Sequence, residues 1–316
     1  MKLPAHTDLS VEAVHAIATR HAFQVTTITR LPDTGIFNAI YLLGQDLVLR
    51  VPRQHPAHID ALYREAIVVP VARAVGVRTP ALIAFDDTCN LVPVPYTLYE
   101  RVHGETLGLL DLEPAETPET WRELGRDLAR LHRSIQADDL RGELAHEEPL
   151  PDPRVRAEEL ATDGYFTSSA ARWLVGWLEH LALSALVPVP HRIVHGDVQA
   201  TNVMVEPENH RYRAIIDWGS AGWADATHDF AAVPLRAVPL LLQGHREIAP
   251  LDRDDTAEAR ILWRYLQLAL LIMPRQPDPL RSWAERPWAL WLEVLRFFAG
   301  PLNRSWAALA PPSRYP

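Results

Sequence analysis

A carboxylate and an amide, Asp197 and Asn202, lie five positions apart in a polar stretch between two apolar runs. The apolar runs at 193–194 and 203–205 predict strands, so the residues between them are expected to form a short loop. Such a loop can hold a carboxylate that orients an attacking hydroxyl and an oxygen ligand for a metal ion, which phosphoryl transfer requires. A polar hairpin turn without a function is the alternative interpretation of this stretch alone.

A second carboxylate, Asp217, follows the apolar run 214–216 and precedes Trp218 and Gly219. An aspartate at the end of a strand is often only a turn former. Here a short hairpin would bring Asp217 back beside Asn202. Oxygen ligands of this kind suit a hard cation such as Mg²⁺, which retains several waters. Together the two motifs therefore predict a metal-dependent site.

The residues before position 103 predict a small sheet with one inserted helix. Strand-like runs separated by turn residues, and a longer helical run that ends near Gly76, give this pattern. A short helix is expected first, at 9–21. The expected strands are 23–31, 36–43, 46–51, 81–85 and 94–102, and the inserted helix is 58–74.

From position 113 onward the pattern is mainly helical, apart from the strand-rich stretch 192–218 that contains both motifs. The acidic, proline-containing stretch 137–153 predicts a surface loop. The expected helices are 118–135, 154–162, 168–186, 256–273 and 280–298. We therefore expect an α+β chain whose two parts meet just after 101–104.

The combined motifs resemble a known family. His195-Gly196-Asp197 with Asn202, followed by Ile216-Asp217-Trp218, is similar to the signature of the aminoglycoside phosphotransferase and choline kinase superfamily. That superfamily has a two-lobed fold similar to that of protein kinases, with a small antiparallel-sheet N-lobe and a mainly helical C-lobe. The resemblance covers most of the chain. It implies a nucleotide-binding lobe at 1–102 and a helical lobe at 103–316 with the catalytic loop and acceptor site.

The resemblance also implies the residues of the reaction centre. Asp197 would be the catalytic base, and Asn202 and Asp217 would bind Mg²⁺. ATP or GTP would be the co-substrate. His195 would order the loop rather than act as the base.

Five further positions match the nucleotide-binding features of the family. Gly35 and Asn38 resemble the nucleotide loop, Arg50 lies on the strand that bears the phosphate-binding cation, and Glu65 lies on the helix with its partner acid. The nucleobase would meet the backbone between Glu100 and Val102. Many members carry lysine on that strand, but Lys2 is the only lysine of this chain. Arg50 or Arg53 must then supply the cation, which the guanidinium can do because it pairs with phosphate and carboxylate.

The composition excludes several partners. The net charge is −9 and no basic stripe is present, which argues against a nucleic-acid partner. No apolar run has the length of a membrane span, and no signal pattern opens the chain. The single cysteine, Cys89, excludes an internal disulfide framework. We therefore expect a cytoplasmic protein that acts on a small hydroxylated molecule, with no membrane partner; its oligomeric state is left open.

Large aromatic residues are frequent after position 256, and they either pack the helical lobe or wall an apolar acceptor pocket. A polycationic aminoglycoside needs an acidic pocket instead. The sequence therefore favours a macrolide-like or sugar-like acceptor. Two alternative functions are a nucleotide-binding pseudokinase that serves as a binding module, and a protein kinase. The chain lacks the Asp-Phe-Gly and Ala-Pro-Glu motifs of protein kinases.

Overall fold

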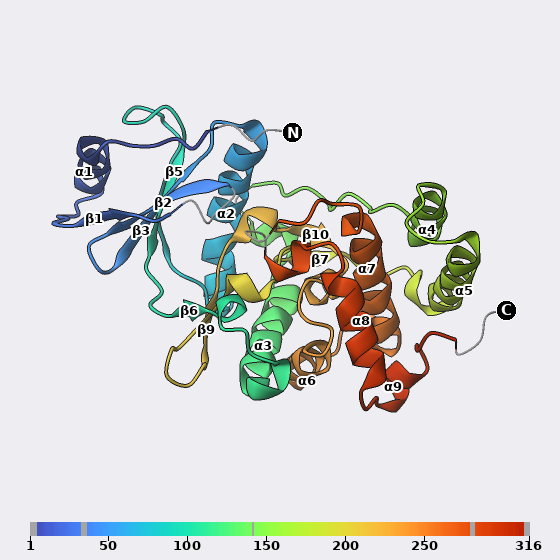
Figure 1. Ribbon diagram of the computed structural model, residues 1–316. Helices are drawn as coiled ribbons and strands as arrows, with labels where there is room; N and C mark the ends of the chain where they lie inside the picture. Colours follow the sequence, from blue (N-terminus) through green and yellow to red (C-terminus); the bar gives the residue numbers. More distant parts are fainter. Residues whose placement is uncertain (1–4, 33–36, 141, 279–281, 313–316) are drawn as a thin grey trace.

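A five-stranded antiparallel sheet forms the first part of the chain (Figure 1). The computed structural model describes residues 5–32, 37–140, 142–278 and 282–312. The strand order is β1-β2-β3-β5-β4, and the inserted helix α2 separates β3 from β4. The elements are α1 (Val11–Arg20), β1 (Ile28–Arg30), β2 (Asn38–Leu43), β3 (Leu47–Pro52), α2 (Pro56–Ala74), β4 (Leu82–Asp86) and β5 (Tyr96–Glu100).

The alternation of side chains along β3 decides which of its residues face the core. Leu47, Leu49 and Val51 are buried in a cluster with residues of α1. Because successive side chains of a strand point to opposite faces, Val48 and Arg50 lie on the other face, toward α2. The pairing of Arg50 with Ile40 of β2 fixes this register. The strand thereby presents one cation to the inner side of the sheet.

The second part of the chain is mainly helical and surrounds a short strand-rich centre (Figure 1). Its helices are α3 (Pro118–Ser134), α4 (Pro153–Thr162), α5 (Ser168–Ala185), α6 (Val238–Ile248), α7 (Ala257–Ile272), α8 (Ala289–Ala299) and α9 (Arg304–Ala307). Its strands are β6 (Glu105–Thr106), β7 (Arg192–Val194), β8 (Val203–Val205), β9 (Tyr212–Ile215) and β10 (Gly222–Ala224).

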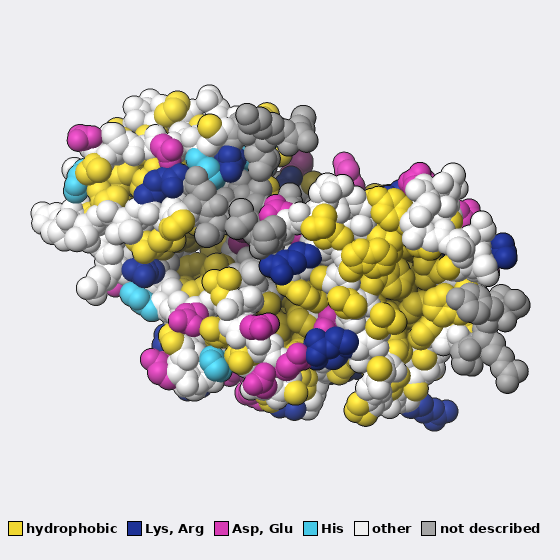
Figure 2. Space-filling model, viewed as in Figure 1, with side chains coloured by type: hydrophobic (Ala, Val, Ile, Leu, Met, Phe, Trp, Pro, Cys, Tyr) yellow, Lys and Arg dark blue, Asp and Glu magenta, His cyan; other side chains and the backbone are white. Residues whose placement is uncertain are grey.

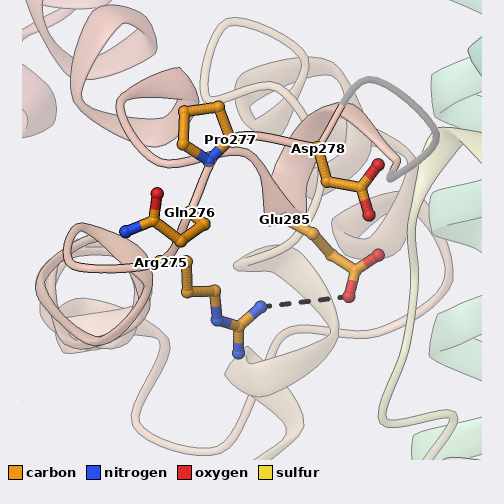
Figure 3. Close-up of a pocket in the computed structure, with 5 residues that line it drawn as sticks. All are labelled: Arg275, Gln276, Pro277, Asp278 and Glu285. Carbon is orange, nitrogen blue, oxygen red and sulfur yellow. Dashed lines mark ion pairs between the residues drawn. The ribbon is translucent and has the colours of Figure 1, made fainter. Parts of the chain in front are cut away.

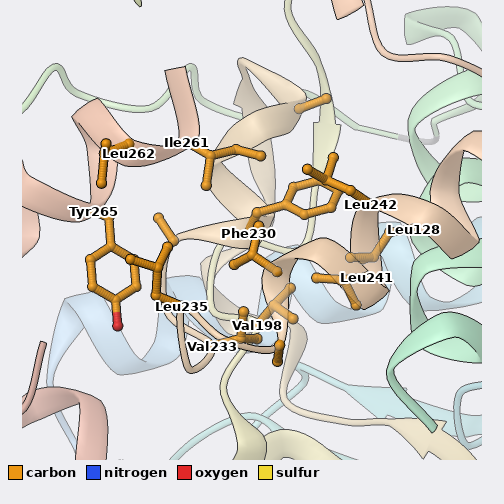
Figure 4. Close-up of a cluster of buried hydrophobic side chains, with 14 of the residues drawn as sticks. Leu128, Val198, Phe230, Val233, Leu235, Leu241, Leu242, Ile261, Leu262 and Tyr265 are labelled. Atoms are coloured by element: carbon orange, nitrogen blue, oxygen red, sulfur yellow. The ribbon is translucent and has the colours of Figure 1, made fainter. Parts of the chain in front are cut away.

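A large buried cluster joins these helices (Figure 4). Phe230, Leu241, Ile261 and Tyr265 are fully buried within it. Residues of α2 belong to the same cluster, including Val68 and Ala72. The helix α2 therefore packs against the helical part as well as following the sheet, so it connects β3 to the residues around Asp217. None of the described helices has the length and apolar character needed to cross a membrane.

The expected α+β architecture is confirmed, and several boundaries differ from those expected. The strand expected at 23–31 is restricted to β1 (Ile28–Arg30). The helix expected at 280–298 begins only at Ala289, and residues 279–281 lie outside the described residues. Arg286 is extended (ψ 141°) because Pro287 follows it. The proline ring clashes with the preceding residue in the helical region. The sequence analysis did not anticipate α6 or β10.

Candidate active site

The loop between β7 and β8 contains Asp197 and Asn202. A short 3-10 helix, Ala200–Asn202, ends this loop, and β8 and β9 then form an antiparallel hairpin. The N–H of Ile216 donates to the Asn202 carbonyl at 2.9 Å. The hairpin expected from the sequence thus returns the chain, and Asp217 follows directly after the residue bonded to Asn202.

Two side-chain amides hold the carboxylate of Asp197. The Asn202 Nδ2 donates to Oδ2 at 3.1 Å and to the Asp197 carbonyl at 2.9 Å, and the Gln199 Nε2 donates to Oδ1. Burial raises the pKa of Asp197, and the hydrogen bond from Gln199 opposes that increase. Because Asn202 uses its nitrogen toward Asp197, its Oδ1 remains the atom that could bind a cation.

A fully buried carboxylate, Asp229, supports the start of the loop. It accepts hydrogen bonds from the N–H groups of His195 (2.9 Å) and Gly196 (2.8 Å), and from His132 Nε2 (2.9 Å). Burial alone would raise the pKa of Asp229, but the bond from His132 and the nearby imidazoles hold the pKa below its usual value. Gly196 has φ 80°, and a Cβ there would lie 2.2 Å from the Ser220 carbonyl oxygen. Only glycine fits this position.

The hydrogen-bond pattern fixes the protonation of His195. Its Nε2 lies 3.1 Å from the carbonyl of Ile216, which can only accept, so Nε2 carries the proton. The N–H of Asp197 donates to Nδ1 at 3.3 Å, so Nδ1 is the acceptor. The ring is neutral, fully buried, and packed against Trp218 with ring centroids 4.6 Å apart. His195 therefore joins the start of the loop to Ile216, which follows β9, and has no nitrogen left for a substrate.

A second histidine pair lies below Asp229. The Nδ1 of His245 donates to the Ala249 carbonyl at 2.9 Å, so its Nε2 accepts from His132 Nδ1 at 3.2 Å. His132 is thus placed to donate to His245 from Nδ1 and to Asp229 from Nε2. Burial and the neighbouring His132 lower the pKa of His245 to about 3, which keeps that ring neutral.

Arg50 connects the sheet, α2 and Asp217. Its guanidinium contacts both oxygens of Glu65, at 2.8 and 2.9 Å, and Oδ1 of Asp217 at 2.8 Å. The hydroxyl of Tyr99 donates to Glu65 at 2.7 Å. Burial raises the pKa of Glu65 to about 7, although Arg50 opposes the increase. Burial disfavours the charged guanidinium, but Glu65 and Asp217 outweigh it and raise the pKa of Arg50.

Asp217 is the more accessible partner of this cluster. Its side chain is 38% exposed, against 13% for Arg50 and 1% for Glu65. Burial would raise the pKa of Asp217, but the charge of Arg50 lowers it below the usual value. The residue has φ 69°, a backbone conformation that aspartate tolerates better than most residues. An ionised, accessible carboxylate therefore lies beside a cation at the end of β9.

The other expected nucleotide residues lie along the sheet. Asn38 begins β2 opposite Pro52; its side chain is largely buried, and its Oδ1 has no hydrogen-bond partner among the described residues. Glu100 ends β5 and pairs with Leu47, at the opposite end of β3. Val102 follows and is half-buried. Gly35 lies outside the described residues. The structure thus groups Asp197, Asn202, Asp217, Arg50 and Glu65, whereas Asn38, Glu100 and Val102 lie at the ends of strands.

A cavity of about 630 Å³ lies in the helical part, lined by Arg275, Gln276, Pro277, Asp278 and Glu285 (Figure 3). Arg275 and Glu285 approach to 3.9 Å. The large aromatic residues do not line it. Trp263, Tyr265, Phe297 and Trp306 are buried in the core, and Trp288 is 53% exposed. Figure 2 shows hydrophobic side chains over much of this face of the helical part.

Three residues of the centre were missed by the sequence analysis. The sequence analysis assigned no role to His132, Asp229 or Gln199. Their functions depend on contacts between residues that are far apart in the sequence. Gln199 contacts Ser282, 83 positions away, and His132 contacts Asp229, 97 positions away. No local pattern encodes such contacts.

Comparisons with known proteins give one family and a shared fold. A model described as the phosphotransferase enzyme family matches residues 27–239. The sequence has no significant match among curated proteins. The solved GDP complex of aminoglycoside 2'-phosphotransferase-IIIa has a TM-score of 0.62 and 16% identity, with 84% of this chain and 91% of that chain covered.

Two further structures are similar over most of their length. Spectinomycin phosphotransferase in complex with ADP and spectinomycin has a TM-score of 0.59 and 14% identity, with 96% of this chain and 98% of that chain covered. Macrolide 2'-phosphotransferase type I has a TM-score of 0.57 and 19% identity, with 86% and 92% covered. At these identities the likeness shows the fold. The expected two-lobed, protein-kinase-like architecture is thereby confirmed.

Proposed function

The chain belongs to the phosphotransferase enzyme family, and from this premise we propose that it transfers the γ-phosphoryl group of ATP or GTP to a hydroxyl of a small molecule. The observation that supports the proposal most directly is the grouping of Asp197, Asn202 and Asp217 beside Arg50. Phosphoryl transfer depends on positioning and on charge stabilisation. This cluster supplies carboxylates, an amide and a cation for both purposes.

Asp197 is the proposed base. Its carboxylate is fixed from both oxygens by neutral amides, and burial raises its pKa, which makes it a better proton acceptor than a solvated aspartate. Each carboxylate oxygen retains a second lone pair beside the one that accepts an amide hydrogen. The acceptor hydroxyl would hydrogen-bond there and lose its proton to Asp197 as its oxygen attacks the γ-phosphorus. The bond from that phosphorus to the bridging oxygen would break, and ADP or GDP would leave.

Asn202 and Asp217 are the proposed Mg²⁺ ligands. The donor set fits this ion, because Mg²⁺ prefers oxygen ligands and usually takes only one or two from protein carboxylates, with waters and phosphate oxygens completing the shell. Asn202 presents Oδ1 away from Asp197, and Asp217 is ionised and accessible. When bound, the ion would neutralise charge that develops on the phosphates.

Arg50 would pair with the nucleotide phosphates in place of the family's lysine, while Glu65 holds it in position. Asn38, at the start of β2, would contribute its side-chain NH2 or the adjoining backbone N–H near the phosphates, because only these groups can donate to phosphate oxygens. Gly35 is proposed for the same role. The nucleobase would meet the backbone between Glu100 and Val102. The N–H groups of Glu100 and Arg101 already donate to the carbonyls of Ala81 and Asp46, so Val102 is the residue that would bind the base.

The proposed acceptor is a neutral, hydroxyl-rich molecule, macrolide-like or sugar-like, rather than a polycationic aminoglycoside. The cavity at 275–278 and Glu285 combines an arginine, an amide and carboxylates, which suits alternating hydrogen-bond donors and acceptors. Arg275 and Glu285 approach to 3.9 Å within this lining. Most aromatic residues of this part pack the core, and the exposed Trp288 does not line the cavity, so they add no support for an apolar pocket.

The proposal is tested by incubating the full chain with Mg²⁺, ATP or GTP in separate reactions, and a panel of macrolides, sugars, spectinomycin and kanamycin. Phosphorylated product is detected by mass spectrometry, with Asp197→Ala as the matched control. We expect product from at least one neutral hydroxylated compound, and none with the variant. Nucleotide binding without product or hydrolysis would indicate a binding module instead, and phosphorylated peptides would indicate a protein kinase.

A further inference from the structure

The side chain of Gln199 connects Asp197 to a segment far away in the sequence. Its Nε2 donates to Oδ1 of Asp197, and its Oε1 accepts from the hydroxyl of Ser282, which lies 83 residues further on. Both polar ends of the amide are therefore used. Because the carboxylate can only accept, it fixes which end of the amide faces Asp197, and the Ser282 hydroxyl stabilises the same orientation.

The two amides that hold Asp197 differ in what supports them. Asn202 is fixed within the loop, because its side chain also donates to the Asp197 carbonyl and its own carbonyl accepts from Ile216. The backbone of Gln199 is likewise fixed, since its N–H donates to the Asp197 carbonyl and its carbonyl accepts from Asn202. Its long side chain has several rotatable bonds, and the contact with Ser282 restricts them. The hydrogen bond from Gln199 to Oδ1 of Asp197 therefore depends on Ser282, which lies outside the loop.

Ser282 belongs to the segment that borders the cavity. Arg275, Gln276, Pro277 and Asp278 line the cavity on one side of it in the sequence, and Glu285 lines it on the other (Figure 3). Ser282 precedes the short 3-10 helix Trp283–Glu285, so its position is tied to that of Glu285. A molecule that fills the cavity and displaces Glu285, and with it the 3-10 helix that follows Ser282, would change the hydrogen bond to Gln199.

We propose that Gln199 is a positioning residue that orients the Asp197 carboxylate toward the acceptor hydroxyl, and that Ser282 couples this orientation to the cavity. The inference rests on the proposed role of Asp197 as the base. Gln199 itself does not exchange a proton. It keeps the plane of the carboxylate fixed, so that the unshared lone pair of Oδ1 faces the attacking oxygen.

The first test uses hydrolysis of Mg²⁺-ATP, with water as the acceptor. Gln199→Ala should lower kcat by roughly tenfold to a hundredfold, the effect of losing one hydrogen bond to a charged group, while KM for ATP stays within about twofold of wild type. Ser282→Ala should lower kcat less, and Ser282→Thr, which keeps the hydroxyl, should recover most of the rate. The double variant should be no slower than Gln199→Ala, because Ser282 acts through Gln199. Gln243→Ala, which alters a glutamine on the surface helix α6, is the control.

The second test needs no turnover. The side-chain amide resonances of Gln199, assigned by their loss in Gln199→Ala, are followed by ¹⁵N–¹H NMR. They should shift in both Asp197→Asn and Ser282→Ala, and remain near the wild-type position in Ser282→Thr. Resonances unaffected by Asp197→Asn, or additive rate losses in the double variant, would overturn the inference. If Asp197→Ala hydrolyses ATP like wild type, the proposed base is wrong; if only Gln199→Ala does so, the positioning role alone is refuted.

Discussion

Removing Arg50 should change how the stability of the protein depends on pH. Arg50 is the cation that faces the buried Glu65, and burial raises the pKa of Glu65 to about 7 despite that cation. In Arg50→Ala, Glu65 loses the interaction that opposes the effect of burial, so its pKa should rise above 7. Glu65 would then remain protonated in the folded variant at pH values where it is ionised in wild type.

The magnitude follows from proton linkage. A carboxyl whose pKa is raised by folding stabilises the folded state fully below its unfolded pKa of 4.5, and loses this contribution as the pH rises through the folded pKa. In wild type the stabilising contribution of Glu65 is mostly lost once the pH exceeds about 7. In Arg50→Ala this contribution continues to fall as the pH rises further. Each further pH unit then costs the variant about 1.4 kcal/mol relative to wild type. Between pH 7 and 8.5 the two proteins should diverge by up to about 2 kcal/mol.

The assay is urea denaturation of both proteins between pH 5.5 and 8.5 without divalent ions, with unfolding free energies obtained by linear extrapolation. Below pH 7 the two curves should run parallel, because Glu65 is protonated in both folded proteins. Glu65→Gln provides the matched control, since Arg50→Ala in that background should give a difference that does not vary with pH. Parallel curves above pH 7, or a divergence that persists in the Glu65→Gln background, would refute the reasoning.

Three catalytic predictions follow from the same cluster. Arg50→Ala should raise the nucleotide KM and lower kcat, with a combined loss in kcat/KM of roughly tenfold to a hundredfold. Arg50→Lys should be partly tolerated, and Arg53→Ala, beyond the end of β3, should reduce kcat/KM less. A larger loss of kcat/KM in Arg53→Ala than in Arg50→Ala would move the phosphate contact to Arg53. Asp197→Ala should reduce phosphoryl transfer by about a hundredfold or more while nucleotide affinity, measured by calorimetry, stays near wild type; activity within a few-fold of wild type would exclude Asp197 as the base. Asp217→Asn and Asn202→Ala should each raise the Mg²⁺ concentration needed for half-maximal rate, and an unchanged Mg²⁺ titration would show that neither residue is a ligand.

The sequence was sufficient where local patterns decide structure. The strand-like run 46–51 predicted β3, which carries Arg50, and the apolar runs 193–194 and 203–205 predicted the loop between them. It was insufficient where tertiary contacts decide. The start of α8 depends on Pro287, which forces the preceding residue out of the helical region, and the helical pattern of 280–298 masked that effect.

The contact between Arg50 and Asp217 shows the same limit within the site. The resemblance predicted that Arg50 would meet Glu65, and the two are in contact. It did not indicate that the second guanidinium nitrogen would bind Asp217, 167 residues away. Arginine presents several donors in a fixed plane, and here two of its nitrogens pair with two carboxylates at once. No local motif encodes this second ion pair.

Three aspartates within 33 positions, Asp197, Asp217 and Asp229, are equivalent as sequence letters but receive different donors. Asp229 accepts from an imidazole and from two backbone N–H groups and is fully buried, so its charge is committed to holding the loop. Asp217 faces a guanidinium and solvent, so it stays ionised and can exchange that partner for another cation. Asp197 alone has only neutral side-chain donors, and it is the one of the three whose pKa is raised, because burial is not offset there by a contacting cation. A base must hold a proton for part of the reaction, and this environment is the one that favours it.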